Sequence, residues 1–288
     1  MFRTVRRWLN LRTISLFIFT VVILVPLLTV VSASLKTMRQ YVTEPLKPPS
    51  PITFDNYRDL FVDYGLHRYF VNSLVLTFCT VVLVILFSTM VSYAIVRAGG
   101  WIGTLLFGLF SAGLMIPAQV NIIPLYGLVV KLESWFASAA WLPDLKFRDS
   151  LPGLIVIEVS ILLSISVFII TGFMKTIPRE LFEAAAMDGS SEWWMYAKLA
   201  VPLSLPSIAS ASIFLCVIVW NDLLYPLLFT GEKAKTLTMA LMMFRGEYES
   251  NYPILFAGVM TVSLPMVAAY VFLQRWFIAG LTSGSLKG

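Results

Sequence analysis

The sequence predicts an all-α integral membrane protein with six transmembrane helices. Only 13% of its 288 residues are charged and 58% are hydrophobic, whereas soluble domains carry roughly 25% charged residues. The apolar runs are about 20 residues or longer, which is the length that an α-helix needs to cross a hydrocarbon core. The short alternating segments that are typical of a membrane β-barrel do not occur.

Six apolar runs account for the predicted spans. They cover about residues 13–35, 69–96, 101–130, 151–174, 207–229 and 254–277. Pro117 and Pro124 interrupt the third run. The first run is too long for the apolar region of a signal peptide and no convincing cleavage site follows it, so we expect a retained helix. A membrane domain, 13–277, is thus expected between an N-terminal segment, 1–12, and a tail, 278–288.

Basic residues set the expected orientation. Counted over all loops, ten Lys and Arg fall on the side of the N-terminus and eleven on the other, which decides nothing. Four arginines precede or open the first span: Arg3, Arg6, Arg7 and Arg12. Because the first span usually dominates topology, we expect a multi-pass protein of the cytoplasmic (inner) membrane. Both termini and segment 175–206 are then cytoplasmic.

The segment between the first two spans combines a Pro-rich linker with a short helix. Thr53 is expected to cap that helix, and its apolar face consists of Phe54, Tyr57, Leu60 and Phe61. Two interpretations fit this helix. It lies at the outer membrane surface or against neighbouring loops, or it belongs to an ordinary ordered loop.

The chain lacks the residue patterns of metal, nucleotide and nucleic-acid sites. Cys79 and Cys216 lie inside apolar runs and His67 has no ligand-type partner nearby, so we expect no metal centre or disulfide framework. No G-x-x-x-x-G-K-[ST] loop occurs. The net charge of +5 comes from basic residues between apolar spans, which argues against nucleic acid. No cofactor and no catalytic residue is expected in this chain.

One long polar segment, ELFEAAAMDGSSEWWMYAKLAVPLSLP, interrupts the apolar chain. Pro178 suits a first helical position, and 179–187 is predicted to be helical. Gly189 is expected in the left-handed conformation that ends a helix. Ser190 or Ser191 then caps a second short helix. A helix of about ten residues is marginal alone in water, so the first helix needs a surface to pack on.

The first helix of this segment presents a small-residue face at Leu181, Ala184, Ala185 and Asp188. Small side chains allow another protein to approach closely. Glu183 fits two interpretations, which are contact with a partner protein and compensation of the helix dipole in a solvated helix. Trp193 and Trp194 are suited to anchor the base of the segment at the lipid interface.

The segment resembles the EAA loop of ABC importer permeases, and the motif falls on Glu183, Ala184, Ala185, Gly189 and Pro202. The resemblance extends over nearly the whole chain. MIPAQVNIIPLYGLV, WNDLLYPLLFT and QRWFIAGLTSGSLKG are similar to the carbohydrate branch of these permeases, and most similar to the second, shorter permease of maltose-type systems. Val201 replaces a frequent Ile, which is a conservative change.

This resemblance implies the type I ABC importer permease fold and half of a translocation path for a sugar or oligosaccharide. It implies a heterodimer with a homologous permease, two cytoplasmic ATPase subunits that use ATP and Mg, and an extracytoplasmic solute-binding protein. The ATPase docking residues would be Glu183, Ala184, Ala185, Met187, Asp188 and Gly189. The tail either reaches the ATPase interface or is a disordered end.

Polar residues inside the apolar runs are candidates for the translocation path: Gln119, Asn121, Glu158, Asn221 and Asp222. Gln119 and Asn121 face a cavity from a broken helix, or their amides satisfy a simple kink. Glu158 is functional, or it lies near the outer interface and reaches water. Asn221 and Asp222 bind sugar hydroxyls, or they bond backbone groups freed near Pro226 or hold helices together.

Two other functions compete with the prediction of a transport subunit. A polytopic membrane enzyme would use Glu158 and Asp222 as paired carboxylates for acid–base chemistry, but no nucleophile motif or His/Cys cluster accompanies them. A channel formed by this chain alone would need no docking loop. The transport subunit therefore remains the leading prediction, and we do not expect an enzyme.

Overall fold

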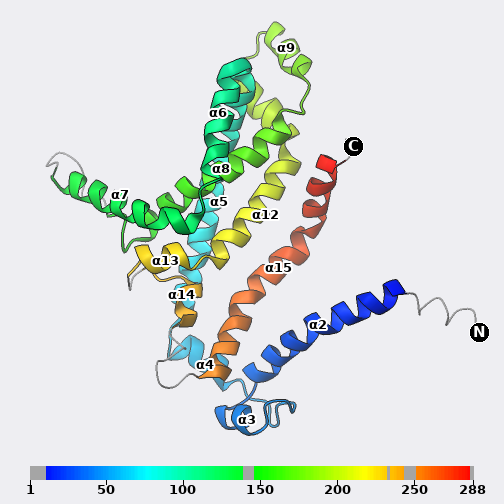
Figure 1. Ribbon diagram of the computed structural model, residues 1–288, viewed down its shortest axis with the longest axis vertical. Coiled ribbons are helices and arrows are strands. Elements are labelled where there is room, and N and C mark those ends of the chain that lie inside the picture. Colours follow the sequence, from blue (N-terminus) through cyan, green and yellow to red (C-terminus); the bar gives the residue numbers. More distant parts are fainter. Residues whose placement is uncertain (1–10, 139–145, 232–233, 243–250, 286–288) are drawn as a thin grey trace, which may run out of the picture. The chain divides into compact units, whose positions relative to one another are not determined.

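The computed structural model describes residues 11–138, 146–231, 234–242 and 251–285, in which helices occur and strands do not (Figure 1). The N-terminal half contains α2 (Leu11–Ser34), α3 (Met38–Thr43), α4 (Asp55–Val62), α5 (Leu66–Ala98), α6 (Gly100–Gly113) and α7 (Ala118–Ser138). The C-terminal half contains α8 (Leu151–Met174), α9 (Arg179–Met187), α10 (Glu192–Met195), a π-helical turn (Tyr196–Ala200), α11 (Val201–Leu203), α12 (Leu205–Asn221), α13 (Leu224–Phe229), α14 (Leu237–Leu241) and α15 (Tyr252–Ser285).

The chain forms two compact units. One consists of residues 1–68 and 240–265, and the other of residues 69–239 and 266–288. The second unit carries α6–α13 and therefore the polar segment. Residues 1–10 of the predicted N-terminal segment and 286–288 of the predicted tail lie outside the described residues.

Five helices of the described chain are long and apolar enough to cross a membrane: Thr13–Ser34, Leu66–Ala98, Gln119–Ser138, Leu151–Met174 and Tyr252–Phe272. A sixth span results if Glu192–Leu203 and Leu205–Asn221 act together, although they meet at an angle of 72°. The predicted all-helical membrane fold is confirmed. The fourth apolar run corresponds to α8 residue for residue.

The fifth apolar run, predicted as one span over 207–229, forms two helices, α12 and α13, which are separated by residues 222–223. The third apolar run also differs from the prediction. It forms two helices, α6 and α7, which are separated by residues 114–117. Pro117 lacks an N–H and disfavours the helical conformation at the residue before it, so the chain breaks there. Pro124 stays inside α7. The polar residues that follow Pro117 therefore lie in the first turns of a new helix, and not in a break between two prolines.

The first unit is held together by buried polar contacts. The Asn56 amide of α4 donates to the carbonyl oxygens of Ser34 and Lys36, each at 2.8 Å, and ties α4 to the end of α2. Thr53 does not cap α4 as expected. Its hydroxyl accepts from the Asp55 N–H at 3.2 Å, but Phe54 occupies the cap position. α4 therefore lies against the end of α2, its place at the outer membrane surface stays a prediction, and its predicted apolar face is divided between buried Leu60 and exposed Phe61.

The second unit is built on α5, α8 and α12. Apolar side chains fill the space between them, including Leu76 and Val84 of α5, Leu154 of α8, and Leu215 and Val219 of α12. A hydroxyl seam continues the contact between α5 and α8. Ser166 Oγ donates to Ser88 Oγ at 2.7 Å, and Thr171 Oγ1 donates to Ser92 Oγ at 2.9 Å. Hydrogen bonds of this kind join helices inside a membrane, where apolar burial supplies no driving force between them.

Candidate functional site

The polar segment has the predicted order of helix, glycine turn and helix. α9 runs from Arg179 to Met187, with Pro178 just before it and not in its first position. Gly189 has φ +81°, and its N–H donates to the Ala186 oxygen at 3.0 Å. The Ser191 hydroxyl accepts from the Trp194 N–H at 3.2 Å and caps α10. The glycine therefore ends α9 in the left-handed conformation that favours glycine.

α9 packs against the rest of the second unit mainly through Phe182, and half-buried Ala185 lies against the same apolar cluster. Phe182 is only 4% exposed and is the single buried residue of α9. Its ring lies 6.1 Å from that of Tyr93, centroid to centroid. The same apolar cluster contains Ile170, Met174, Ile177 and Met195. This contact supplies the packing surface that a helix of nine residues requires.

The other side of α9 is exposed. Five of the six predicted docking residues are exposed, namely Glu183, Ala184, Met187, Asp188 and Gly189, and Ala185 is half-buried. Met187 is 89% exposed. The exposed side of the segment 183–189 thus carries a methionine, two carboxylates and the small residues Ala184, Ala186 and Gly189. Phe182 packs on the opposite side of the helix.

Three residues that hold the segment to α5 were missed by the sequence analysis. Tyr93 Oη donates to Glu192 Oε2 at 2.5 Å, and Arg97 Nε donates to the same oxygen at 3.0 Å. Arg97 Nη2 also pairs with Glu192 Oε1, so the guanidinium contacts both carboxylate oxygens. No local pattern identifies these partners, because Arg97 and Glu192 lie 95 residues apart in the sequence.

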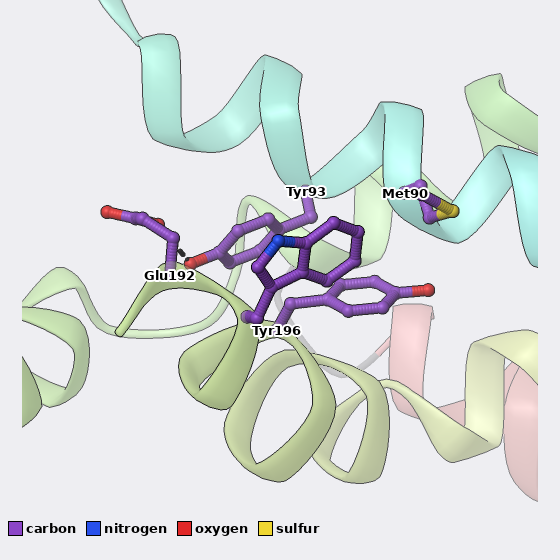
Figure 2. A pocket seen from close by; sticks show the side chains of 5 residues that line it. Met90, Tyr93, Glu192 and Tyr196 are labelled. Carbon is purple, nitrogen blue, oxygen red and sulfur yellow. Dashed lines mark hydrogen bonds between the residues drawn. The ribbon is translucent and has the colours of Figure 1, made fainter. Parts of the chain in front are cut away.

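A pocket of about 200 Å³ lies beside this contact, lined by Met90, Tyr93, Glu192, Trp193 and Tyr196. Figure 2 shows Tyr93 reaching from α5 towards Glu192, and Tyr196 below them. The Tyr196 hydroxyl lies 2.9 Å from that of Thr89, and the rings of Tyr93 and Tyr196 lie 5.5 Å apart. Aromatic and polar contacts therefore join the second part of the segment to α5. Trp193 is 68% exposed and Trp194 46% exposed, and their place at the lipid interface stays a prediction.

Two predicted path residues come together in the second unit. Glu158 is 2% exposed, so it does not reach water as one interpretation required. Its carboxyl group interacts with the Asp222 side chain, and Tyr225 lies near both. Within the described chain, Glu158 Oε1 and Tyr225 Oη have no hydrogen-bond partner. The sequence had singled out both carboxylates without indicating that helix packing places them side by side.

Asn221 and Asp222 satisfy backbone groups where α12 ends and α13 begins. The Asp222 carboxylate accepts from the N–H groups of Leu224 and Tyr225 in the first turn of α13, each at 3.2 Å, while Leu223 occupies the cap position. Asn221 Nδ2 donates to the Val217 oxygen at 2.8 Å. These contacts correspond to the interpretation in which the two residues bond freed backbone groups.

Gln119 and Asn121 lie in the first turns of α7, where Gln119 is exposed and Asn121 is half-buried. The structure brings Glu158 and Asp222 together, with Asn221 next in the chain, whereas Gln119 and Asn121 belong to a different helix. In the described ranges, no group of three or more His, Cys, Asp or Glu residues is arranged to hold a metal ion.

Comparisons with known proteins place the chain among transport components. A family model described as "Binding-protein-dependent transport system inner membrane component" matches residues 84–282. The chain is 33% identical over 284 residues to the arabinooligosaccharides transport system permease protein AraQ of Halalkalibacterium halodurans, covering 96% of each chain. It is 30% identical over 266 residues to the melibiose/raffinose/stachyose import permease protein MelC of Bacillus subtilis, covering 92% of this chain and 91% of that one.

The fold is also that of a solved transporter. A bacterial ABC transporter involved in the import of alginate matches with a TM-score of 0.79 at 17% identity, covering 96% of this chain and 98% of that chain. The predicted permease subunit is confirmed, and no finding supports the membrane-enzyme alternative. The chain therefore belongs to the family of inner membrane components of binding-protein-dependent transport systems, and it is an ABC importer permease.

Proposed function

We propose that this permease forms half of a translocation path for a sugar or oligosaccharide and pairs with a homologous permease. Relatives at 30–33% identity support the solute class, since their names specify arabinooligosaccharides, melibiose, raffinose and stachyose. A trehalose transport permease, SugB of Mycobacterium tuberculosis, is also 30% identical over 268 residues. A binding protein on the outer side delivers the solute.

We also propose that α9 docks onto cytoplasmic ATPase subunits, which use ATP and Mg. The observation that carries this proposal is that α9 has two different sides. One holds the buried anchor Phe182, and the other is exposed and consists of Glu183, Ala184, Met187, Asp188 and Gly189. The sequence contains no nucleotide-binding loop, so the energy comes from other subunits. Coupling then needs a contact whose free energy differs between the inward- and outward-facing states. In this proposal both termini and α9 are cytoplasmic.

Crosslinking tests the docking proposal. In a chain whose Cys79 and Cys216 are replaced by alanine, Met187→Cys is expected to capture an ATPase subunit, because residue 187 is 89% exposed on the docking face. Leu46→Cys is the matched control, since Leu46 is 91% exposed but belongs to a segment expected on the outer side. Capture by Leu46→Cys, or by neither variant in the assembled complex, would contradict the proposal.

The solute proposal is tested by transport. Vesicles that contain the whole assembly, with ATP inside and a binding protein outside, are expected to accumulate a labelled oligosaccharide. The matched sample uses a labelled polyol phosphate at the same concentration. If only the polyol phosphate accumulates, the protein is still an importer permease, but the proposal that it carries a carbohydrate is wrong.

Asp222 is expected to stabilise the first turn of α13, because its carboxylate accepts from two N–H groups there. Asp222→Ala should destabilise the protein by about 1 kcal/mol, whereas Asp222→Asn should preserve most of the stability because an asparagine side-chain oxygen accepts from such N–H groups as well. Thermal unfolding in detergent and uptake kinetics provide the two measurements. If Asp222→Asn keeps its stability but changes the KM for the solute, the carboxylate instead contacts the solute.

Among the other path candidates, Gln119 is exposed and remains a candidate, whereas the Glu158 side chain is buried.

A further inference from the structure

We propose that Tyr93, Arg97 and Glu192 form a coupling latch. Through this latch, movement of the polar segment 175–206, called the docking loop here, is transmitted to α5. This inference rests on the docking role proposed above for α9. It adds the positioning residues that carry the motion from the docking helix into the membrane domain. All three residues belong to the second unit.

The latch connects the long helix α5 to the docking loop at the Glu192 carboxylate. Arg97 lies in the last turn of α5, which is a continuous helix of 33 residues. Glu192 is the first residue of α10 and follows Gly189 by three positions. Both guanidinium contacts and the Tyr93 hydroxyl converge on the Glu192 carboxylate. Only residues 188–191 separate α9 from Glu192, so a displacement of α9 is passed through this short turn to the latch and to α5.

One face of α5 carries all of these contacts. Thr89, Tyr93 and Arg97 follow one another at intervals of four residues, so they lie on the same face of the helix. Thr89 contacts the Tyr196 hydroxyl, and Arg97 contacts Glu192. Tyr93 contacts both parts of the loop, because its ring lies 6.1 Å from Phe182 and 5.5 Å from Tyr196. This row of contacts lets α5 follow the loop as a unit.

The contact is suited to transmission more than to stability. The Arg97 and Glu192 side chains are 33% and 57% exposed, and exposed ion pairs contribute little to folding. Stability comes from the apolar cluster around Phe182. The pocket of about 200 Å³ beside Tyr93 and Trp193 shows that apolar packing does not fill the whole contact. The loop and α5 are therefore joined by the apolar cluster and, beside the pocket, by directional polar bonds to Glu192.

The chain supplies a matched control. Arg148 Nε pairs with Glu133 Oε2 at 2.6 Å, and Arg148 Nη1 donates to the Tyr126 hydroxyl at 3.2 Å. This cluster has the same three residue types as the latch and involves no residue of the docking loop. The Glu133 side chain is only 13% exposed and also accepts from the N–H groups of Phe147 and Arg148, so reversing this pair disturbs its surroundings at least as much as reversing the latch. A loss of coupling that occurs only at the latch is therefore not the general effect of reversing an ion pair.

The experiment uses the complete assembly reconstituted in vesicles with saturating binding protein, and it measures solute transported per ATP hydrolysed. Arg97→Glu is expected to lower this ratio roughly 5-fold or more, the range of typical allosteric couplings. The double variant Arg97→Glu/Glu192→Arg should restore most of the ratio. Tyr93→Phe, which keeps the ring and removes the hydroxyl, should give an intermediate loss. Arg148→Glu should leave the ratio unchanged.

A wild-type ratio in Arg97→Glu, or a double variant that assembles but does not recover, would overturn the latch. If Arg97→Glu fails to assemble, Tyr93→Phe decides, because an unchanged ratio in that variant also overturns it. Co-purification of the ATPase and the Met187→Cys crosslink are followed in parallel. If both are present and the transport ratio of the latch variants is unchanged, the latch alone is rejected. If both are absent in assemblies whose residues 93, 97 and 192 are unchanged, the docking proposal itself is rejected.

Discussion

Replacing Gly189 by proline is expected to abolish ATP-driven uptake while the protein still inserts into the membrane. Gly189 has φ +81°, and a proline ring fixes φ near −65°. Proline would also remove the N–H that donates to the Ala186 oxygen at 3.0 Å. A cost of about 3 kcal/mol or more would lower the population of the docking-competent turn by roughly 100-fold. Uptake into vesicles, normalised to the amount of membrane-inserted protein, is the measurement.

Two alanine variants isolate the backbone effect. A Cβ at Gly189 would have no neighbour within 4 Å, so Gly189→Ala is strained only by its positive φ, at a cost of about 1–2 kcal/mol. Gly172 of α8 also has open space around it but has no positive φ, so Gly172→Ala should not reduce uptake. Normal uptake by Gly189→Pro would contradict the docking role of α9.

Replacing Phe182 by alanine is expected to detach α9 from the membrane domain. Phe182 is the single buried side chain of this helix, and truncation of a buried phenylalanine costs about 3–5 kcal/mol. A helix of nine residues is not stable in water without a packing surface, so the loss should fall mainly on the docking loop. We expect rapid proteolysis within residues 179–191 and a loss of uptake.

Leu181→Ala is the matched control, because Leu181 precedes Phe182 on the same helix and is 44% exposed. It should resist proteolysis like the wild type. Proteolysis is the readout for this control, because Leu181 lies on the predicted small-residue face and its uptake also reports on docking. Phe182→Ala with normal uptake would show that docking does not require α9 to be held against Tyr93. The Arg97 variants should behave differently from Phe182→Ala, since they leave the apolar cluster intact and change only the yield of transport per ATP.

Local signals were enough to predict most helices and the shape of the polar segment. Apolar runs of spanning length predicted α8 at 151–174, and the order of residues predicted α9 at 179–187. Gly189 could be recognised because few other residues adopt a left-handed turn without strain. The resemblance of the segment to the EAA loop predicted the permease family, which the family match and the relatives confirm.

Some local signals were ambiguous. Pro117 and Pro124 are both compatible with a kink or a break, since each removes one backbone hydrogen bond. The break precedes Pro117, whereas Pro124 remains within α7. Neighbouring groups decide whether the freed backbone is satisfied, and the sequence does not specify them. Thr53 similarly has the side chain of a cap, but Phe54 occupies that position.

By itself, the sequence determined the bounds of α8 and α9, the approximate positions of the other long apolar helices, which segment stays polar and to which family the chain belongs. The tertiary structure alone decided that Phe182 is the buried face of α9, that Glu158 meets Asp222, and that Arg97 and Tyr93 contact Glu192. Hydrophobicity, caps and positive φ act over a few residues and can be recognised locally. Contacts across 95 residues of sequence depend on the register in which α5 packs against its neighbours, and that register arises only when the helices assemble.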